Sequence, residues 1–354
     1  MGNFIKYIGR DNMKRILVCG NFGAGKDIYD GQTVKTINIY DELVKKYGTN
    51  NVKLIDTCDI KKKPISFLYK ALKETKKLKN LIVLPGDRGV KIIIPLFTIL
   101  KKIRNYKMHY VVIGAWLPQM IIKEKKLKKS LKKVDYIYVE NTKTLKELNK
   151  MGFYNVFKFN NFKKLEISKH GYKYNDNILK CCIFSRIEKG KGISDAINVV
   201  KEINAKRNES IFLDIYGKID LSYEKELYSL LENEKNIKYV GVVKSNESVE
   251  TIEKYQLLLF PTRRYTEGTP GTIIDAYFAG VPVLASTWEN FDDVVIENAT
   301  GIGYSFENLN DFKNKLNKII DNKEQLKRMS STCKKEAMKY TPEYCMKTLL
   351  KRIQ

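Results

Sequence analysis

Several residue patterns are missing from this chain of 354 residues. It has two histidines, and its six cysteines include no CxxC pair, so the spacings of a structural zinc site or a disulfide framework are absent. We expect the thiols to be small buried apolar groups in a reducing compartment. No cluster of metal-ligating residues stands out, so no bound metal is expected.

Long apolar runs are also missing. The longest, residues 92–100, contains Pro95 and is far shorter than the roughly 20 residues that cross a bilayer. Charged residues interrupt every apolar stretch near the start of the chain, which leaves no signal-peptide core. We therefore expect a cytoplasmic protein that meets a membrane only at its surface.

Negative charge is scarce. The chain has 65 Lys and Arg against 40 Asp and Glu, a formal net charge of +25. This excess of positive charge attracts phosphorylated ligands, anionic lipid surfaces or nucleic acid. A genome biased toward Lys codons would also produce such an excess, without any binding function. The length and the 43% hydrophobic content predict two domains with sizeable cores.

Short apolar runs alternate with amphipathic stretches along the whole chain, which predicts βαβ units around parallel sheets. The predicted strands are 15–19, 52–56, 81–84, 110–113, 135–139, 179–184, 212–216, 237–240, 257–260 and 281–285. The predicted helices include 32–47, 142–151, 192–203, 221–233, 272–280, 309–320 and 323–340.

The alternation stops in a polar stretch near residues 162–177 and then resumes. The fold class predicted is α/β, with two Rossmann-like, doubly wound domains facing each other across a cleft. The predicted boundaries are 1–165 for the first domain, 166–178 for a linker, 179–340 for the second domain and 341–354 for a last helix.

Residues 257–287, LLLFPTRRYTEGTPGTIIDAYFAGVPVLAST, carry most of the recognisable chemistry. A buried strand is followed by a polar loop and by a glycine-bracketed turn that opens a helix, whose free N–H groups suit a phosphate. Glu267 precedes the turn, and Asp275 lies one helical turn after it. Carboxylates accept hydrogen bonds from hydroxyls, so this order fits a sugar, a diphosphate and a ribose.

This segment resembles the donor-binding motif of glycosyltransferase family 4 (group 1), the retaining group of the GT-B fold. That motif has two acids separated by seven residues and an AGVPV-type strand, as at Glu267, Asp275 and 279–283. The second acid is usually Glu in the family, and Asp275 is one methylene shorter. The wider segment is similar to enzymes that build bacterial capsules and exopolysaccharides. The donor contacts implied are Glu267, Gly268, Thr269, Pro270, Gly271, Thr272 and Asp275.

Residues 181–193, CCIFSRIEKGKGI, resemble the Arg…Lys-Gly element of the same family, whose two cations hold the donor diphosphate. The resemblance assigns this role to Arg186 and Lys191, with Lys189 as an alternative. Such cations stabilise the leaving diphosphate and can replace a divalent metal. The resemblance also implies that Gly217, at a strand end, lets the backbone approach the donor.

The first glycine-rich loop has two interpretations. Gly20, Gly25 and Lys26 fit GxxxxGK after a strand, but Asp27 stands where a P-loop needs Ser or Thr. A P-loop ATPase is therefore the alternative function. The resemblance instead implies an acceptor-side loop at the cleft, with Gly31, Gln32, Thr33 and Lys35 as acceptor or phosphate contacts.

Neither histidine is expected to act in catalysis. Many relatives carry a histidine in the region of residues 110–118, but here His109 opens the strand and His170 falls in the presumed linker. No carboxylate stands out as a covalent nucleophile. The resemblance therefore implies a front-face reaction assisted by the leaving diphosphate.

Residues 120–134, MIIKEKKLKKSLKKV, predict a basic amphipathic helix. It fits either an anionic membrane surface, beside a polyprenyl- or lipid-linked acceptor, or an ordinary packed helix with a Lys-rich outer side. The charge and the 22 tyrosines would also suit RNA, although no RNA-binding motif is present.

The resemblance implies a transfer of a hexosyl group from a nucleotide sugar to a glycan or lipid-linked acceptor in polysaccharide synthesis. The donor that it implies first is a UDP-sugar. No cofactor beyond this co-substrate is expected. The resemblance also implies that the last helix crosses back to the first domain.

Overall fold

The computed structural model describes residues 15–23, 31–170, 178–207 and 210–353. The chain forms two compact units. Unit 1 contains residues 1–159 and 346–354, and unit 2 contains residues 160–345. The boundary precedes the predicted linker at 166–178, because Leu165 and Ile167 already pack against a core of unit 2.

Unit 1 contains a parallel sheet, with six strands in the part of the chain that is described, in the order β2-β1-β3-β4-β5-β6. The connection direction reverses at β1, so the switch point lies between β1 and β3. The strands are β1 (Ile16–Gly20), β2 (Val52–Asp56), β3 (Asn80–Leu84), β4 (Lys107–Val111), β5 (Tyr136–Val139) and β6 (Val156–Lys158).

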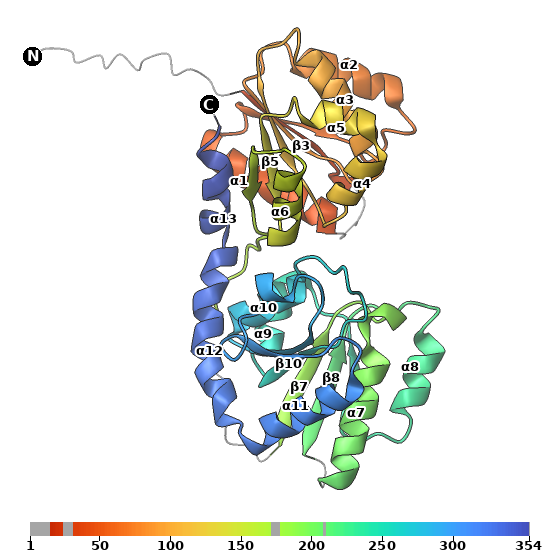
Figure 1. Cartoon of the computed structure of the whole chain (residues 1–354). Helices are drawn as coiled ribbons and strands as arrows, with labels where there is room; N and C mark the ends of the chain where they lie inside the picture. Colours follow the sequence, from red (N-terminus) through yellow and green to blue (C-terminus); the bar gives the residue numbers. More distant parts are fainter. Residues whose placement is uncertain (1–14, 24–30, 171–177, 208–209, 354) are drawn as a thin grey trace, which may run out of the picture. The chain divides into compact units, whose positions relative to one another are not determined.

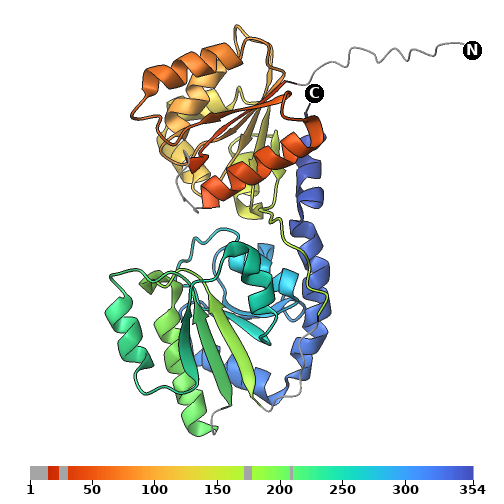
Figure 2. The same cartoon turned by 180° about the vertical axis from the view of Figure 1, so that it is seen from behind.

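The helices of unit 1 cover both sides of this sheet. Helix α1 lies on one side, and α2, α3 and α5 lie on the other (Figures 1 and 2). Apolar residues of the strands and of the helices between β2 and β6 form one core cluster. Ile39 and Leu43 of the first helix are buried as well, outside this cluster. The helices are α1 (Gly31–Tyr47), α2 (Pro64–Glu74), α3 (Val90–Leu100), α4 (Leu117–Lys123), α5 (Lys125–Leu131) and α6 (Thr142–Lys150).

The predicted basic helix at 120–134 is wrong as a single element. The backbone leaves the helical conformation at Glu124, between α4 and α5. Six residues separate Ile121 from Leu127, a rotation of about 240° on a continuous helix, so one helix would not bury both. The break lets Ile121, Leu127 and Leu131 all reach the core.

Unit 2 has a second parallel sheet, in the order β12-β11-β10-β7-β8-β9 over the residues described. Its switch point lies between β7 and β10, because consecutive strands run outward from this pair in opposite directions. The strands are β7 (Leu179–Phe184), β8 (Ile211–Tyr216), β9 (Ile237–Gly241), β10 (Leu257–Phe260), β11 (Val283–Ser286) and β12 (Gly301–Tyr304).

Two apolar clusters, one on each side of the second sheet, form the core of unit 2. The helices of the second half are α7 (Ile193–Lys206), α8 (Glu224–Leu231), α9 (Ser248–Ile252), α10 (Gly271–Ala279), α11 (Leu309–Asp321), α12 (Glu324–Ala337) and α13 (Pro342–Leu350). Helix α13 begins in unit 2 and ends in unit 1. Among the described helices, none is long and apolar enough to cross a bilayer.

Two predicted strands are displaced for identifiable reasons. Strand β4 begins three residues before the predicted start at 110, because the polar His109 is satisfied inside the sheet. Strand β11 begins at Val283 rather than at 281, because the Val281 N–H closes α10 by donating to the Ala276 carbonyl and Pro282 has no N–H.

Candidate functional site

The two motifs of the second half meet at one edge of the unit 2 sheet. The loop at 185–192 follows β7, and the loop at 261–270 follows β10. These strands are hydrogen-bonded neighbours that flank the switch point. Ligands of doubly wound folds bind at the carboxyl ends of such strands.

Lys191 and Glu267 form the central contact of this edge. The Lys191 ammonium lies 2.8 Å from Glu267 Oε2 and 5.9 Å from the centre of the Phe260 ring. The two side chains are 12% and 19% exposed, so the pair is shielded but still reachable from solvent. Asn290 Nδ2 donates to the Glu267 carbonyl at 2.8 Å, which fixes the backbone of the acid.

Gly192 makes this contact possible. Its φ of +66° is left-handed, and a Cβ there would lie 1.8 Å from the Pro261 carbonyl oxygen. Any other residue would therefore push the first loop away from the second. The Arg263 N–H also donates to the Gly190 carbonyl at 3.1 Å, which ties the two loops together.

The N-terminus of α10 is the second polar feature of the site. The helix begins at Gly271 after Pro270, and no side chain caps it. The Thr272 hydroxyl is buried and has no hydrogen-bond partner within the described structure. An uncapped N-terminus has free N–H groups and a partial positive charge, which suit an anion.

Asp275 lies one turn into α10 and is 4% exposed. Burial raises its pKa, and the adjacent Lys163 opposes that shift. The Lys163 ammonium lies 2.5–2.6 Å from the two carboxylate oxygens. Lys163 also contacts the start of α10, where a Cβ on Gly271 would lie 3.3 Å from its Cε. The sequence analysis did not single out Lys163, because no local pattern relates residues 163 and 275.

Arg186 stands at the start of the first loop with its side chain 71% exposed, and its described partner is Glu188 at 3.8 Å. Glu188 is held more closely by Arg264, at 2.8 Å. Arg263 forms a two-bond ion pair with the buried Asp195 of α7. Arg263 and Arg264 were not predicted as site residues, and they act here as braces of the two loops.

Gly217 has a structural reason to be glycine. Its φ is +140°, and a Cβ would lie 1.6 Å from the Ser185 carbonyl oxygen at the end of the neighbouring strand. The residue therefore allows the ends of β7 and β8 to approach each other. Its predicted contact with a ligand stays a prediction.

The predicted acceptor-side residues lie at the switch point of unit 1. Gly31 and Gln32 open α1, and Gln32 Nε2 donates to the Leu84 carbonyl at the end of β3. Thr33 is buried. Lys35 differs from the expectation of an acceptor contact, because it is 2% exposed and its ammonium lies 2.5 Å from Glu140. Gly25 and Lys26, which suggested a P-loop, lie outside the described residues.

His109 is a structural residue. Its ring nitrogens contact the Tyr138 hydroxyl at 2.9 Å and Asn80 Oδ1 at 3.3 Å. Burial lowers its pKa to about 3, so the ring is neutral at physiological pH.

All six cysteines are free thiols, and all but Cys58 are buried. Within the described residues, no group of three or more His, Cys, Asp or Glu side chains is placed to hold a metal ion.

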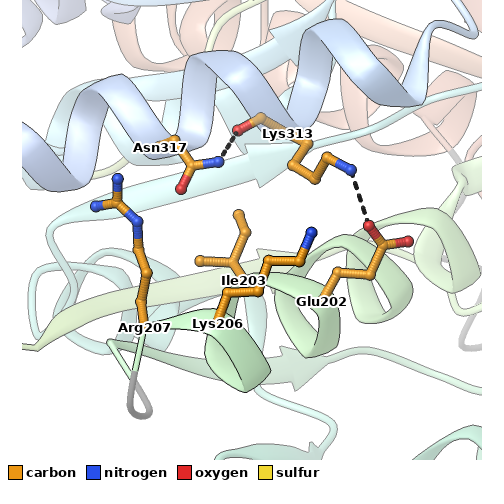
Figure 3. A pocket seen from close by; sticks show the side chains of 6 residues that line it. All are labelled: Glu202, Ile203, Lys206, Arg207, Lys313 and Asn317. Carbon is orange, nitrogen blue, oxygen red and sulfur yellow. Dashed lines mark hydrogen bonds and ion pairs between the residues drawn. The ribbon is translucent and has the colours of Figure 1, made fainter.

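A hollow of about 330 Å³ lies between α7 and α11, away from these residues. Figure 3 shows its lining, in which Lys313 pairs with Glu202 and Asn317 donates to the Lys313 carbonyl. The hollow lies beside the last turns of α7, and α7 starts at the carboxyl edge of the sheet. It is therefore near the opposite edge, and we do not assign it to the site.

Comparison with known proteins gives one family match. Residues 165–336, all within unit 2, match the family Glycosyl transferases group 1. The uncharacterized glycosyltransferase MJ1178 of Methanocaldococcus jannaschii is 26% identical over 157 residues, which are 44% of this chain and 42% of that protein. The match thus spans less than half of this relative's own length.

Solved structures match over nearly the whole chain. HepE of Anabaena, determined in complex with UDP, superposes with a TM-score of 0.73 at 12% identity, over 95% of this chain and 98% of its own. The lipopolysaccharide outer core galactosyltransferase WaaB superposes with a TM-score of 0.70 at 15% identity, over 95% and 98%. At these identities the likeness establishes the fold, which is the GT-B fold.

Proposed function

Because residues 165–336 match the family Glycosyl transferases group 1, we propose that the chain is a hexosyltransferase. It transfers a sugar from a nucleoside diphosphate to a glycan or lipid-linked acceptor in cell-surface polysaccharide synthesis. The reaction proceeds with retention of anomeric configuration and without a metal ion, in the reducing cytoplasm where six free thiols persist.

The observation that carries this proposal is the Lys191–Glu267 pair beside the uncapped start of α10. One switch point holds a cation, a carboxylate and a helix N-terminus. These groups suit the parts of a nucleotide sugar, because the cation and the N-terminus attract its diphosphate and the carboxylate accepts hydrogen bonds from its hydroxyls. The diphosphate takes Lys191, Arg186 and the N–H groups of residues 268–272. Glu267 accepts hydrogen bonds from the sugar hydroxyls, and Asp275 accepts one from the ribose.

The cations would act on the leaving group. As the bond between the anomeric carbon and the β-phosphate oxygen breaks, the nucleoside diphosphate gains negative charge. Fixed cations in a shielded site stabilise this charge more than they stabilise the bound donor. The acceptor oxygen bonds to the anomeric carbon on the face that the diphosphate leaves, and the acceptor proton passes to the departing phosphate oxygen.

UDP is the proposed nucleotide, supported by the UDP complex of the HepE structure. A cell-surface acceptor is supported by the likeness to WaaB. On the acceptor side we propose direct contacts by Gly31, Gln32 and Thr33. Lys35 would act through Glu140, which its ammonium already holds in place.

A thermal-shift panel tests the donor class. The full chain is heated with UDP, GDP, UDP-sugars, magnesium-ATP or a short RNA, each with and without EDTA. A ligand that binds the folded state raises the midpoint of unfolding. We expect a rise with UDP and its sugars that EDTA does not change. A rise with magnesium-ATP alone, or with RNA alone, would contradict the proposal in favour of a P-loop ATPase or an RNA-binding protein.

Two variants test the residue roles. Glu267→Ala should lower kcat by roughly 10²–10³ while UDP still stabilises the protein, because the acid contacts the sugar. Lys191→Ala should lose much of the stabilisation by UDP. Lys225→Ala is the control, since Lys225 is an exposed lysine of α8 outside the proposed site. Turnover near that of the wild type in both Glu267→Ala and Lys191→Ala would remove the site assignment.

A further inference from the structure

The positive charge of this protein is concentrated in one part of the chain. Residues 160–345, which form unit 2, contain 28 Lys and Arg against 27 Asp and Glu. Nearly all of the net charge of +25 therefore belongs to unit 1. Residues 61–133 alone contain 21 Lys and Arg but only Glu74, Asp87 and Glu124 as acids. A genome-wide preference for Lys codons would have acted on both units alike.

Helix α2, within this segment, has an apolar stripe that faces solvent. Phe67 and Ala71 are its buried residues and pack into the core. Its outer side carries Ile65, Leu68, Tyr69 and Leu72, exposed by 83, 43, 66 and 39%. The 3–4 spacing places these four side chains on one side of the helix. An outer helix surface is normally polar, so a continuous apolar stripe there indicates a binding surface.

Helix α3 repeats the arrangement beside α2. Ile92 and Ile99 are 59% and 61% exposed, and Ile103, in the turn that follows, is 70% exposed. Phe67 of α2 and Phe97 of α3 meet edge to face at 6.4 Å, so the two helices are neighbours. Both helices lie on the same side of the unit 1 sheet (Figures 1 and 2). Since Phe67 and Phe97 pack into the core, the exposed stripes lie on the solvent side of each helix.

Lysines without a described carboxylate partner surround these stripes. Exposed lysines of this region that have no ion-pair partner among the described residues include Lys61, Lys62, Lys63, Lys70, Lys73, Lys76, Lys77, Lys79 and Lys102. Aliphatic side chains inside a ring of cations suit the boundary between lipid headgroups and acyl chains. Anionic lipids supply the opposite charge.

We propose that the outer side of α2 and α3 is a docking surface for an anionic lipid bilayer. Two copies of so basic a surface would repel each other, which disfavours self-association through it. A single-stranded nucleic acid would need aromatic side chains for base stacking, and among these exposed apolar side chains only Tyr69 is aromatic. The surface would bring the proposed transfer reaction to a lipid-linked acceptor, and its binding can be measured without that reaction.

Vesicle flotation of the full chain tests the surface. The vesicles are phosphatidylcholine alone or phosphatidylcholine with about 30% phosphatidylglycerol. We expect binding to the anionic vesicles only, and a loss of about tenfold in affinity when salt rises from about 0.1 to about 0.5 M. Ile65→Ser/Ile99→Ser and Lys70→Glu/Lys73→Glu should each weaken binding by about tenfold or more.

Matched variants on unit 2 provide the controls. Tyr228→Ser/Val242→Ser removes two apolar side chains that are more than half exposed, as Ile65 and Ile99 are, and Lys225→Glu/Lys327→Glu makes the same change of charge. Both should bind vesicles as the wild type does, and all four variants should keep the wild-type midpoint of unfolding. No binding to anionic vesicles, or undiminished binding by the α2 and α3 variants, would overturn the proposal. If the wild-type protein does not bind vesicles and the Ile65→Ser/Ile99→Ser variant breaks up a dimer or abolishes RNA binding, the surface would be assigned to that partner instead.

Discussion

At the scale of single residues, the buried Asp275 depends on Lys163 for its charge balance. Burial disfavours the carboxylate and raises its pKa, and the ammonium 2.5 Å away offsets part of that cost. Lys163 comes from the segment that enters unit 2, whereas Asp275 belongs to the helix proposed to bind the donor. Their pairing therefore links the entry segment to the donor helix.

Lys163→Ala should lower the free energy of unfolding by about 3 kcal/mol, because it leaves a buried carboxylate without its partner. Adding Asp275→Asn should restore much of that loss, since the uncompensated charge is gone. Denaturant unfolding of the single and double variants measures both values. Lys169→Ala, an exposed lysine of the same segment, is the control and should change little. Equal losses in Lys163→Ala and Lys169→Ala would show that the pair contributes nothing.

The buried His109 should make the stability of the protein depend on pH. Its pKa is about 3 in the folded protein and about 6.5 in an unfolded chain, so between these values the unfolded state binds the proton more readily. The free energy of unfolding should therefore fall by about 2 kcal/mol from pH 7 to pH 5 through this residue. His109→Gln should flatten this part of the stability curve, and a change at His170, the other histidine, should not. An unchanged slope in His109→Gln would contradict the assignment.

At the scale of elements, the loops after β7 and β10 form one structure. Gly192 provides the close approach to Pro261, and the Arg263–Asp195 and Arg264–Glu188 pairs brace the two loops. The position of Lys191 relative to Glu267 follows from these contacts.

Gly192→Ala tests this dependence. Gly48 is the matched control, because it has a similar φ of +81° but nothing within 4 Å of the place that a Cβ would take. Gly48→Ala should cost about 1 kcal/mol for the left-handed conformation alone. Gly192→Ala should cost clearly more and should also abolish stabilisation by UDP, because the loop must move. Equal thermal shifts with UDP in the two variants would show that the close approach is dispensable.

At the scale of the whole molecule, the chain begins in unit 1, forms unit 2 and ends in unit 1. Met346, Leu349 and Ile353 are buried, and the Arg352 guanidinium lies 3.5 Å from the centre of the Phe157 ring of β6. Residues 346–353 therefore complete the packing of unit 1.

Leu349→Ala should destabilise unit 1 by about 2–5 kcal/mol, the usual cost of removing a buried leucine side chain. Hydrogen exchange should report faster opening of β5 and β6 and unchanged protection of β9 in unit 2. Lys351→Ala, an exposed neighbour, is the control. Faster exchange throughout both units would mean that they unfold together.

The sequence alone predicted much of the architecture. The strands β2, β7 and β10 have their predicted bounds. Of these, β10 is a continuous apolar run, LLLF, as expected of a strand buried on both faces of a parallel sheet. The strand β12, GIGY, was not predicted, because two glycines weaken the apolar pattern. Those glycines are required by packing, since a Cβ on Gly301 would lie 2.5 Å from the Val283 carbonyl oxygen. The short β6 was missed as well.

Part of the candidate site could also be predicted from the sequence, and part could not. The local order of glycine, acid and cation was enough to single out Lys191, Glu267 and the start of α10, because a loop and a helix N-terminus are formed by consecutive residues. Partners distant in sequence were decided by the tertiary structure alone: Lys163 with Asp275, Lys35 with Glu140, and Arg263 with Asp195. The same holds for the charge. Composition gives its amount, but only the fold assembles the lysines and apolar stripes of α2 and α3 on one surface, because exposure depends on what each helix packs against.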